Sequence, residues 1–252
     1  MKNDMGLVSI SFRGLSVEEI AARMKKSGLS VVEMGADVHC LPGDDDRAAA
    51  VKRVCDENGI KICAYGSYYR VGAKEALPYG FADVVRTASI LGAETVRAWA
   101  FNKGSAETTE EEYAGVIADM RSICAMAAEK GLTVSLECHN RTLTDEYHSA
   151  LKLLADADCG NLAMYWQPNQ FKSAAYNKEA AAALKDYVTN VHVFNWEEKE
   201  RFPLGDAVGL WREYRAILDG GAKKHAYMLE FMPHDTPEEL EKESEALRAI
   251  MA

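Results

Sequence analysis

Short apolar segments rich in β-branched residues recur at roughly thirty-residue intervals along this chain of 252 residues. Most of them follow a Gly or an Asn, which favours a break in the chain before each segment. They predict eight β-strands: Leu7–Ser11, Leu29–Gly35, Ile60–Tyr65, Thr95–Ala100, Leu132–Glu137, Asn161–Trp166, Asn190–Asn195 and Ala226–Phe231. This repetition constrains the fold more than any other feature of the sequence.

Amphipathic helix patterns lie between these segments, and several begin with capping signals. Ser16-Val-Glu-Glu19 and Thr109-Glu-Glu-Glu112 are capping boxes, in which the hydroxyl and the Glu each satisfy an otherwise unpaired backbone amide. Thr236-Pro-Glu-Glu239 adds a proline at the first helical position, where its missing N–H costs nothing. Strands that alternate with helices imply parallel pairing, because each crossover helix restarts the next strand in the same direction.

Eight such units in a chain of this length match a (β/α)8 TIM barrel. We therefore predict an α/β fold with a single domain over residues 1–252. An open doubly wound sheet is the competing architecture, but no GxGxxG follows the first strand and the even spacing suits closure better. No linker, low-complexity tract or composition shift indicates a second domain.

Composition and charge argue against several classes of partner. The chain has 29 Lys and Arg against 39 Asp and Glu, a net charge of −10, without a basic cluster, which argues against nucleic acid. No apolar run approaches the ~18–20 residues that cross a bilayer. The N-terminus lacks the apolar region of a signal peptide, and the six cysteines form no CxxC pair. We expect a cytoplasmic protein with reduced thiols and no membrane contact.

Two glutamates lie deep within strongly apolar strands, near the carboxyl ends where a TIM barrel carries its active site. They are Glu137 in VSLECHN and Glu230 in YMLEFMP. A carboxylate in such a strand must be paired, metal-bound or protonated, because its desolvation otherwise costs several kcal/mol. A salt bridge to a neighbouring Arg is the simplest interpretation. Their equivalent places in units five and eight favour a functional pair.

Units six and seven add Gln167 in YWQPNQ and His192 in NVHVFNW. Four strand-end groups from four successive units can converge on one point above the barrel. Two carboxylates, an imidazole and an amide oxygen suit a divalent cation, with Mn or Mg more natural than Zn. A lone histidine is more often a hydrogen-bonded core residue, so the prediction depends on the ordered set.

Aromatic residues also gather at the predicted strand ends: Trp99, Trp166, Trp196, Tyr65, Tyr68 and Tyr69. Such rings stack on the C–H faces of a sugar, although aromatic residues favour strands and cores in any case. We expect at least two of them to line a pocket, whereas Trp166 could face the helices.

Other polar residues are candidates for contacts with a substrate. His139 lies two residues beyond Glu137, on the same face if the strand persists. Arg97 and Arg141 could bind an acidic or phosphorylated substrate; equally, Arg97 could only neutralise Glu33 or Glu137. The candidate substrate-binding residues are His139, Arg97, Trp99, Tyr68, Trp196 and Gln170.

The ordered set resembles the xylose isomerase-like TIM-barrel superfamily, the sugar isomerase/epimerase group. The similarity extends over nearly the whole chain, through GLSVVE, RAWA, ECHNRTLT and PLGDAVGLW. In that family a Glu, an Asp, a His and a Glu from strands five to eight hold one divalent metal, and Glu137, His192 and Glu230 match those positions. The strand-six motif Asp-x-x-His is replaced here by Gln167-Pro-Asn-Gln170.

The resemblance implies a divalent metal held by Glu137, Gln167, His192 and Glu230. Because Gln167 brings no charge, binding is expected to be weak and less selective, and complete loss of the metal is the alternative. The family's two glutamates are also its acid and base, which assigns to Glu137 and Glu230 the transfer of a proton beside a carbonyl.

The leading hypothesis is a metal-assisted isomerase or epimerase of a small sugar, cyclitol or related keto-acid. A lyase or dehydratase stays open, because proton removal beside a carbonyl also begins β-elimination. A metal-free sugar-binding protein is a third reading. The superfamily's abasic-site DNA nuclease needs a trinuclear zinc cluster, which six His and no strand-six Asp cannot supply. Family members often form dimers or tetramers, so a homo-oligomer is compatible with the resemblance.

Overall fold

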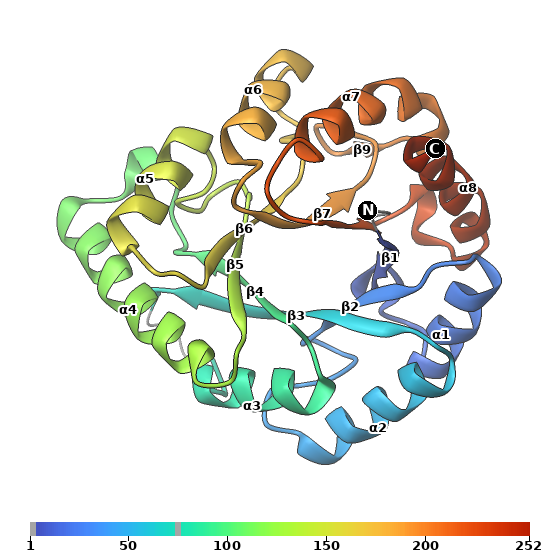
Figure 1. Cartoon of the computed structure of the whole chain (residues 1–252), viewed down its shortest axis with the longest axis horizontal. Coiled ribbons are helices and arrows are strands. Elements are labelled where there is room, and N and C mark those ends of the chain that lie inside the picture. Colours follow the sequence, from blue (N-terminus) through green and yellow to red (C-terminus); the bar gives the residue numbers. More distant parts are fainter. Residues whose placement is uncertain (1–3, 74–76) are drawn as a thin grey trace.

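The computed structural model describes residues 4–73 and 77–252 and forms a closed barrel of eight parallel strands (Figure 1). Each strand pairs with its sequence neighbours and β1 closes the barrel against β10, which confirms the predicted α/β TIM barrel. The barrel strands are β1 Asp4–Val8, β2 Val31–Gly35, β3 Lys61–Val71, β4 Thr95–Ala100, β5 Thr133–Glu137, β6 Leu162–Trp166, β7 Val188–Val193 and β10 Ala226–Leu229. Two short strands, β8 Trp196–Glu197 and β9 Glu200–Arg201, form a separate hairpin.

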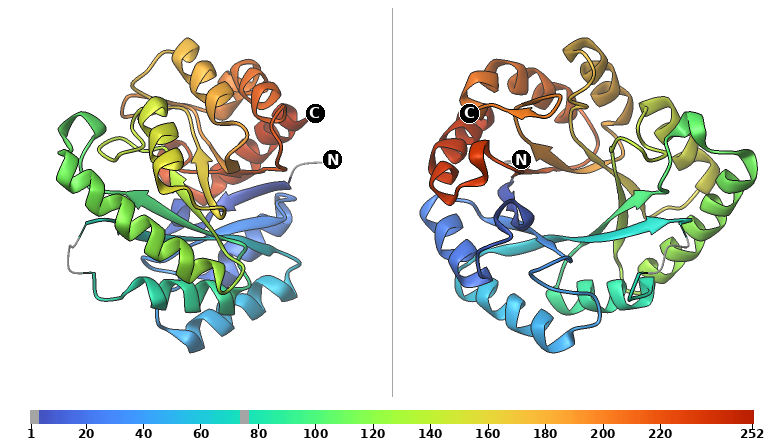
Figure 2. Two further views of the ribbon diagram at one scale, coloured as in Figure 1. Left: turned by 60° about the vertical axis from the view of Figure 1, so that its left-hand side comes forward. Right: turned by 180° about the vertical axis from the view of Figure 1, so that it is seen from behind.

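The helices form an outer ring around this barrel (Figure 2). They are α1 Val17–Lys26, α2 Asp45–Glu57, α3 Phe81–Leu91, α4 Glu110–Ala128, α5 Tyr147–Ala157, α6 Ala174–Leu184, α7 Val208–Leu218 and α8 Leu240–Met251. Within residues 4–73 and 77–252, which the structure describes, no helix is long and apolar enough to cross a membrane.

Two of the three predicted helix starts have the expected cap. Ser16 and Glu19 form a capping box at α1, and Thr109 and Glu112 form one at α4. The third differs, because Pro237–Glu239 is a 3₁₀ turn and α8 begins only at Leu240. The side chain of Thr236 makes no capping hydrogen bond there.

Two strands differ from their predicted ranges by three residues or more at an end, whereas the others agree to within two residues. The first strand is Asp4–Val8 instead of Leu7–Ser11, because the chain turns into the 3₁₀ helix Ser9–Phe12 directly after Val8. The third continues to Val71, six residues beyond its predicted end at Tyr65. Its pairing with β4 shifts register between Gly66 and Arg70, and Tyr68 in this interval has a left-handed φ of 56°. A β-bulge of this kind redirects a side chain that regular pairing would place elsewhere.

The barrel interior is apolar at one level and charged at the next. Strand residues two positions apart point to the same face, so the buried apolar residues Val31 and Met228 are followed inside the barrel by the buried carboxylates Glu33 and Glu230. The helices cover the outer face of the strands with a larger apolar cluster. The polar layer therefore lies at the carboxyl end of the barrel.

Candidate active site

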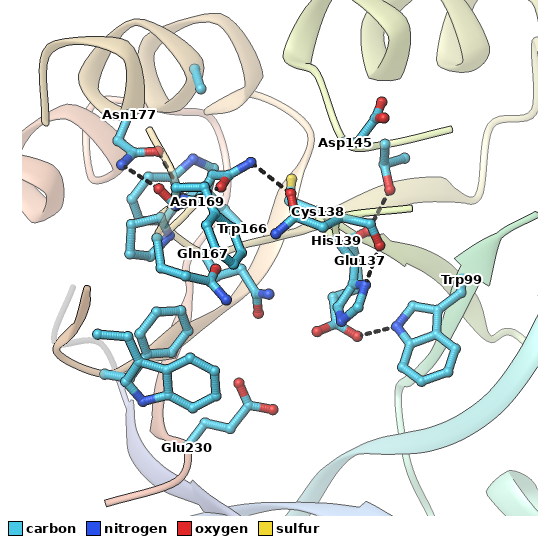
Figure 3. Close-up of a pocket in the computed structure, with 18 of the residues that line it drawn as sticks. Trp99, Glu137, Cys138, His139, Asp145, Trp166, Gln167, Asn169, Asn177 and Glu230 are labelled. Atoms are coloured by element: carbon cyan, nitrogen blue, oxygen red, sulfur yellow. Dashed lines mark hydrogen bonds between the residues drawn. The ribbon is translucent and has the colours of Figure 1, made fainter. Parts of the chain in front are cut away.

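A cavity of about 490 Å³ opens at the carboxyl ends of the strands (Figure 3). All six candidate substrate-binding residues line it, as do three of the four candidate metal ligands. These lining residues are Tyr68, Arg97, Trp99, His139, Gln170, Trp196, Glu137, Gln167 and Glu230. The fourth candidate ligand, His192, is fully buried and is not among the lining residues.

The two glutamates meet at the floor of this cavity together with His192. Glu137 is the last residue of β5, His192 belongs to β7, and Glu230 directly follows β10. One ligand atom from each of the three lies within 4.8 Å of the others. Residues nearly one hundred positions apart in the sequence thus face one another, as the barrel geometry predicts.

The donor atoms around His192 suit a divalent cation. Its Nδ1 lies 2.8 Å from Gln167 Oε1, 3.4 Å from Glu230 Oε2 and 3.7 Å from Glu137 Oε1. Adjacent ligands of a six-coordinate ion lie about 3 Å apart when each bond is about 2.1 Å. One imidazole nitrogen surrounded by three side-chain oxygens at this spacing therefore fits the predicted ligand set.

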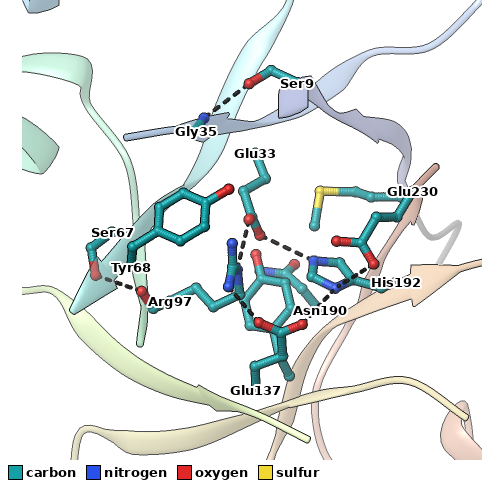
Figure 4. Close-up of polar contacts among 12 residues, drawn as sticks. Ser9, Glu33, Gly35, Ser67, Tyr68, Arg97, Glu137, Asn190, His192 and Glu230 are labelled. Atoms are coloured by element: carbon teal, nitrogen blue, oxygen red, sulfur yellow. Dashed lines mark hydrogen bonds and ion pairs between the residues drawn. The ribbon is translucent and has the colours of Figure 1, made fainter. Parts of the chain in front are cut away.

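Arg97 binds two buried carboxylates at once (Figure 4). Its Nε donates to Glu33 Oε1 at 2.7 Å, and its Nη1 donates to Glu137 Oε2. Trp99 Nε1 donates to the same Glu137 oxygen at 2.6 Å. The sequence left open whether Arg97 pairs with a glutamate or faces the substrate. It forms ion pairs with both Glu33 and Glu137, and it also lines the cavity.

These contacts separate the pKa values of the two catalytic candidates. Burial raises the pKa of Glu137, but Arg97 and His192 outweigh it and hold that pKa well below its usual range. Burial, opposed by His192 and reinforced by Glu137, raises the pKa of Glu230 to about 7. Burial also lowers the pKa of His192, but Glu230 and Glu33 raise it to about 10. Similar residues with divergent pKa values are typical of an acid–base pair.

One wall of the cavity is a row of rings from β3, β4 and the loop after β5. Tyr68 packs edge-on against Trp99, with ring centroids 5.3 Å apart, and Trp99 packs against His139 at 5.2 Å. The guanidinium of Arg70 lies 4.3 Å from the centre of the Trp99 ring. Arg13 Nη2 donates to the Tyr68 hydroxyl at 2.9 Å and holds that ring in place.

A second row of rings comes from the far side of the barrel. Trp196 packs between Phe194 and Phe231, with centroids 4.8 and 5.7 Å away, and its Nε1 donates to the Phe231 carbonyl. The hairpin that carries Trp196 is tied to the loop after β6, because Glu198 N donates to Gln170 O. Two aromatic walls therefore stand above an acidic floor.

The other aromatic candidates serve packing wholly or in part. Tyr65 is buried and donates its hydroxyl to Cys40 O, and Tyr69 packs against Phe81; neither lines the cavity. Trp166 lines the cavity and also packs against Trp211 and Tyr214 of α7. Four of the six aromatic candidates thus line the cavity, which agrees with the expectation of at least two: Tyr68, Trp99, Trp166 and Trp196.

Several residues of the site are not among the candidates named from the sequence. Glu33, considered only as a partner of Arg97, lies within the apolar strand β2, so the argument applied to Glu137 also singles it out. It is fully buried beside Arg97 and His192. Phe231 is the last residue of a predicted strand, but its left-handed φ of 48° has no sequence signal. Asn140 and Asn169, which bond to each other at 3.0 Å, come from two loops whose proximity only the fold determines.

Residues 19–250 match the family model for the xylose isomerase-like TIM barrel. The chain belongs to this family. Among curated proteins, it is 39% identical over 67 residues to a 3-dehydroshikimate dehydratase of Bacillus anthracis. That match spans 27% of this chain and 24% of the length of the relative.

Three solved structures have the same fold as this chain over almost their whole length. The probable 3-DHS dehydratase of Bacillus anthracis superposes with a TM-score of 0.80 at 19% identity, covering 97% of this chain and 98% of that one. A 3-keto-D-glucoside 4-epimerase from E. coli gives 0.72 at 16% identity, covering 98% of each chain. A xylose isomerase-like protein from Mycobacterium smegmatis, solved in complex with magnesium, gives 0.73 at 12% identity, covering 99% and 97%.

Proposed function

We propose that this protein is an enzyme that removes a proton from carbon beside the carbonyl of a small hydroxylated substrate, a sugar, cyclitol or related keto-acid. The observation that carries this proposal is the glutamate pair. Glu137 and Glu230 face one cavity from the ends of β5 and β10, and their oxygens lie within reach of one substrate. A positioned acid and base of this kind typically contribute 10²–10⁴-fold to the rate of proton transfer.

The two glutamates differ in how firmly they are held. Glu137 Oε2 accepts hydrogen bonds from both Arg97 and Trp99, which keeps this side chain ionised and fixed. Glu230 contacts only His192 among the ion pairs of the described residues. We assign proton removal and return to Glu230, and orientation of the substrate with the complementary proton transfer to Glu137.

The candidate ligands Glu137, Gln167, His192 and Glu230 would hold a divalent ion, Mn or Mg rather than Zn. When bound, this ion supplies polarisation of the carbonyl and hydroxyl oxygens of the substrate. The neutral Gln167 lowers the negative charge of the ligand set, so the proposed binding is weak. The magnesium in the Mycobacterium smegmatis relative supports the class of ion.

Two outcomes can follow proton removal. Return of the proton to the same or a neighbouring carbon gives an epimer or isomer, and the E. coli epimerase supports this outcome by fold. Loss of a β-hydroxyl gives a dehydrated product, and the partial identity to the curated 3-dehydroshikimate dehydratase supports this outcome. Arg141 lines the cavity and, among the described residues, has no ion-pair partner, which suits a keto-acid.

The test is hydrogen exchange in D₂O with added Mn²⁺, followed by NMR on a panel of ketoses and 3-dehydroshikimate. The wild type is expected to exchange the C–H beside the carbonyl of at least one compound. Glu230→Gln should slow this exchange by about 100-fold or more. Glu243→Gln, which changes a buried carboxylate outside the cavity, should leave the rate unchanged.

The products separate the two outcomes, because dehydration adds ultraviolet absorbance and epimerisation does not. Exchange at the wild-type rate in both Glu137→Gln and Glu230→Gln would contradict the proposal.

A further inference from the structure

Glu33 lies beneath the cavity and does not line it. Its side chain is fully buried, and each of its oxygens has a different partner. Oε1 accepts from Arg97 Nε at 2.7 Å, and Oε2 lies 3.3 Å from His192 Nε2 (Figure 4). A carboxylate without access to the cavity therefore connects two residues of the candidate site.

The first connection leads from Glu33 through Arg97 to Glu137. With its Nε held by Glu33, Arg97 directs Nη1 to Glu137 Oε2. Trp99 occupies the same oxygen, so Glu137 Oε1 is the oxygen that faces His192 Nδ1 at 3.7 Å. The orientation of Arg97 thus decides which Glu137 oxygen is available at the floor of the cavity.

The second connection leads directly to His192. When the imidazole is neutral and donates Nε2–H to a carboxylate, Nδ1 carries no proton and can bind a metal, and such an outer partner fixes both the tautomer and the ring orientation. Here Nδ1 faces the oxygens of Gln167, Glu230 and Glu137. The two oxygens of Glu33 therefore orient two of the four candidate ligands.

The space for this arrangement depends on Gly66 in β3. Gly66 pairs with Arg97 on one side and with Gly35 on the other. A Cβ at position 66 would lie 2.5 Å from Glu33 Oε1 and 2.8 Å from Arg97 Nη2. Real Cβ contacts are not this short, so any side chain at this position would displace the ion pair.

We propose that Glu33 is a positioning residue of the active site, that it orients Glu137 through Arg97 and His192 directly, and that Gly66 provides the space for it. This inference rests on the proposed function for its effect on catalysis. Its structural part, the orientation of Arg97 and His192, does not depend on turnover.

The experiment compares the wild type with Glu33→Gln and Gly66→Ala. Gln keeps the shape of Glu but offers only one accepting oxygen, so one of the two partners loses its acceptor. Calorimetry measures the affinity for Mn²⁺, and steady-state kinetics on the substrate found above give kcat and KM. ¹H–¹⁵N NMR records the Nε–H signal of Arg97. Arg97→Lys assigns this signal.

Glu33→Gln is expected to weaken Mn²⁺ affinity about 10–100-fold, to lower kcat with KM within about twofold, and to shift the Arg97 Nε–H signal. Gly66→Ala should also weaken Mn²⁺ affinity, lower kcat and shift the Arg97 Nε–H signal. It serves as the second variant if Glu33→Gln does not fold. The matched controls are Glu243→Gln, a buried carboxylate elsewhere, and Gly115→Ala, where no atom lies within 4 Å of the added Cβ. Both controls should match the wild type in Mn²⁺ affinity, in kcat and in the Arg97 Nε–H signal.

The failure of this inference is distinguishable from the failure of the proposed function. An unchanged Arg97 signal in both Glu33→Gln and Gly66→Ala overturns the positioning role, whatever the activity. A shifted signal with wild-type Mn²⁺ affinity and kcat also overturns it, because the orientation then has no effect on the site. If the wild type exchanges no proton on any compound, the proposed function fails, and a shifted Arg97 signal with weakened Mn²⁺ affinity still supports positioning.

Discussion

At the scale of single residues, two glutamates that look alike in the sequence have different surroundings. Both follow an apolar run and both are buried, but Arg97 and Trp99 reach only Glu137. The pKa of Glu137 is therefore lowered, whereas burial raises that of Glu230 to about 7. Position in the sequence identified the pair, and partners from another strand made its members unlike.

Gln167 is the residue at which charge can be tested directly. Gln167→Glu keeps the position of the oxygen that lies 2.8 Å from His192 Nδ1 and adds one negative charge. Attraction between this charge and a bound cation should tighten Mn²⁺ binding by about 10-fold or more in calorimetry. Gln170→Glu adds the same charge elsewhere on the cavity wall and is the control. Equal tightening by both variants would contradict Gln167 as a ligand.

At the scale of elements, the sequence predicted features that depend on neighbouring residues and missed a feature that depends on a second strand. The capping boxes at α1 and α4 involve residues three positions apart, and both form. The bulge of β3 depends on pairing with β4, and no local signal predicts it. This bulge matters for the site, because Tyr68 of the first aromatic wall lies within it.

The caps give a test with an internal control. Thr109→Ala removes the hydroxyl that accepts from Glu112 N at the start of α4, and the expected loss is about 1 kcal/mol in the free energy of unfolding. Thr236→Ala removes a hydroxyl that makes no capping hydrogen bond, so its expected effect is below about 0.5 kcal/mol. Urea unfolding measures both. Equal losses would contradict the assignment of the caps.

At the scale of the whole molecule, Glu243 of α8 connects distant segments, because both of its oxygens accept from Leu204 N at 3.2 Å. Burial, opposed by Leu204 N–H and reinforced by Glu239, raises its pKa to about 7, against about 4.3 in an unfolded chain. The folded state therefore holds this proton more tightly, so its contribution to stability falls as pH rises from about 4.3 to about 7.

Glu243→Gln removes this ionisation. At pH 8 it should raise Tm by about 2–4 °C, equivalent to on the order of 1 kcal/mol, and near pH 4.5 it should differ little from the wild type. Thermal melts across pH 4.5–8 measure the difference. Glu245→Gln, an exposed change on the same helix, is the control. A pH-independent effect of Glu243→Gln would show that packing rather than ionisation is responsible.

The sequence by itself determined the fold class, the number of barrel strands and the four candidate ligands that come together at one end of the barrel. Strand alternation, helix periodicity and the strand-end rule are local or repeating properties, so Glu137, Gln167, His192 and Glu230 could be named in advance. Only the tertiary structure decided what each of them touches. Arg97 could have paired with Glu33 or Glu137, and it binds both because barrel closure brings three strands within one guanidinium's reach. Long-range contacts of this kind have no signature in neighbouring residues.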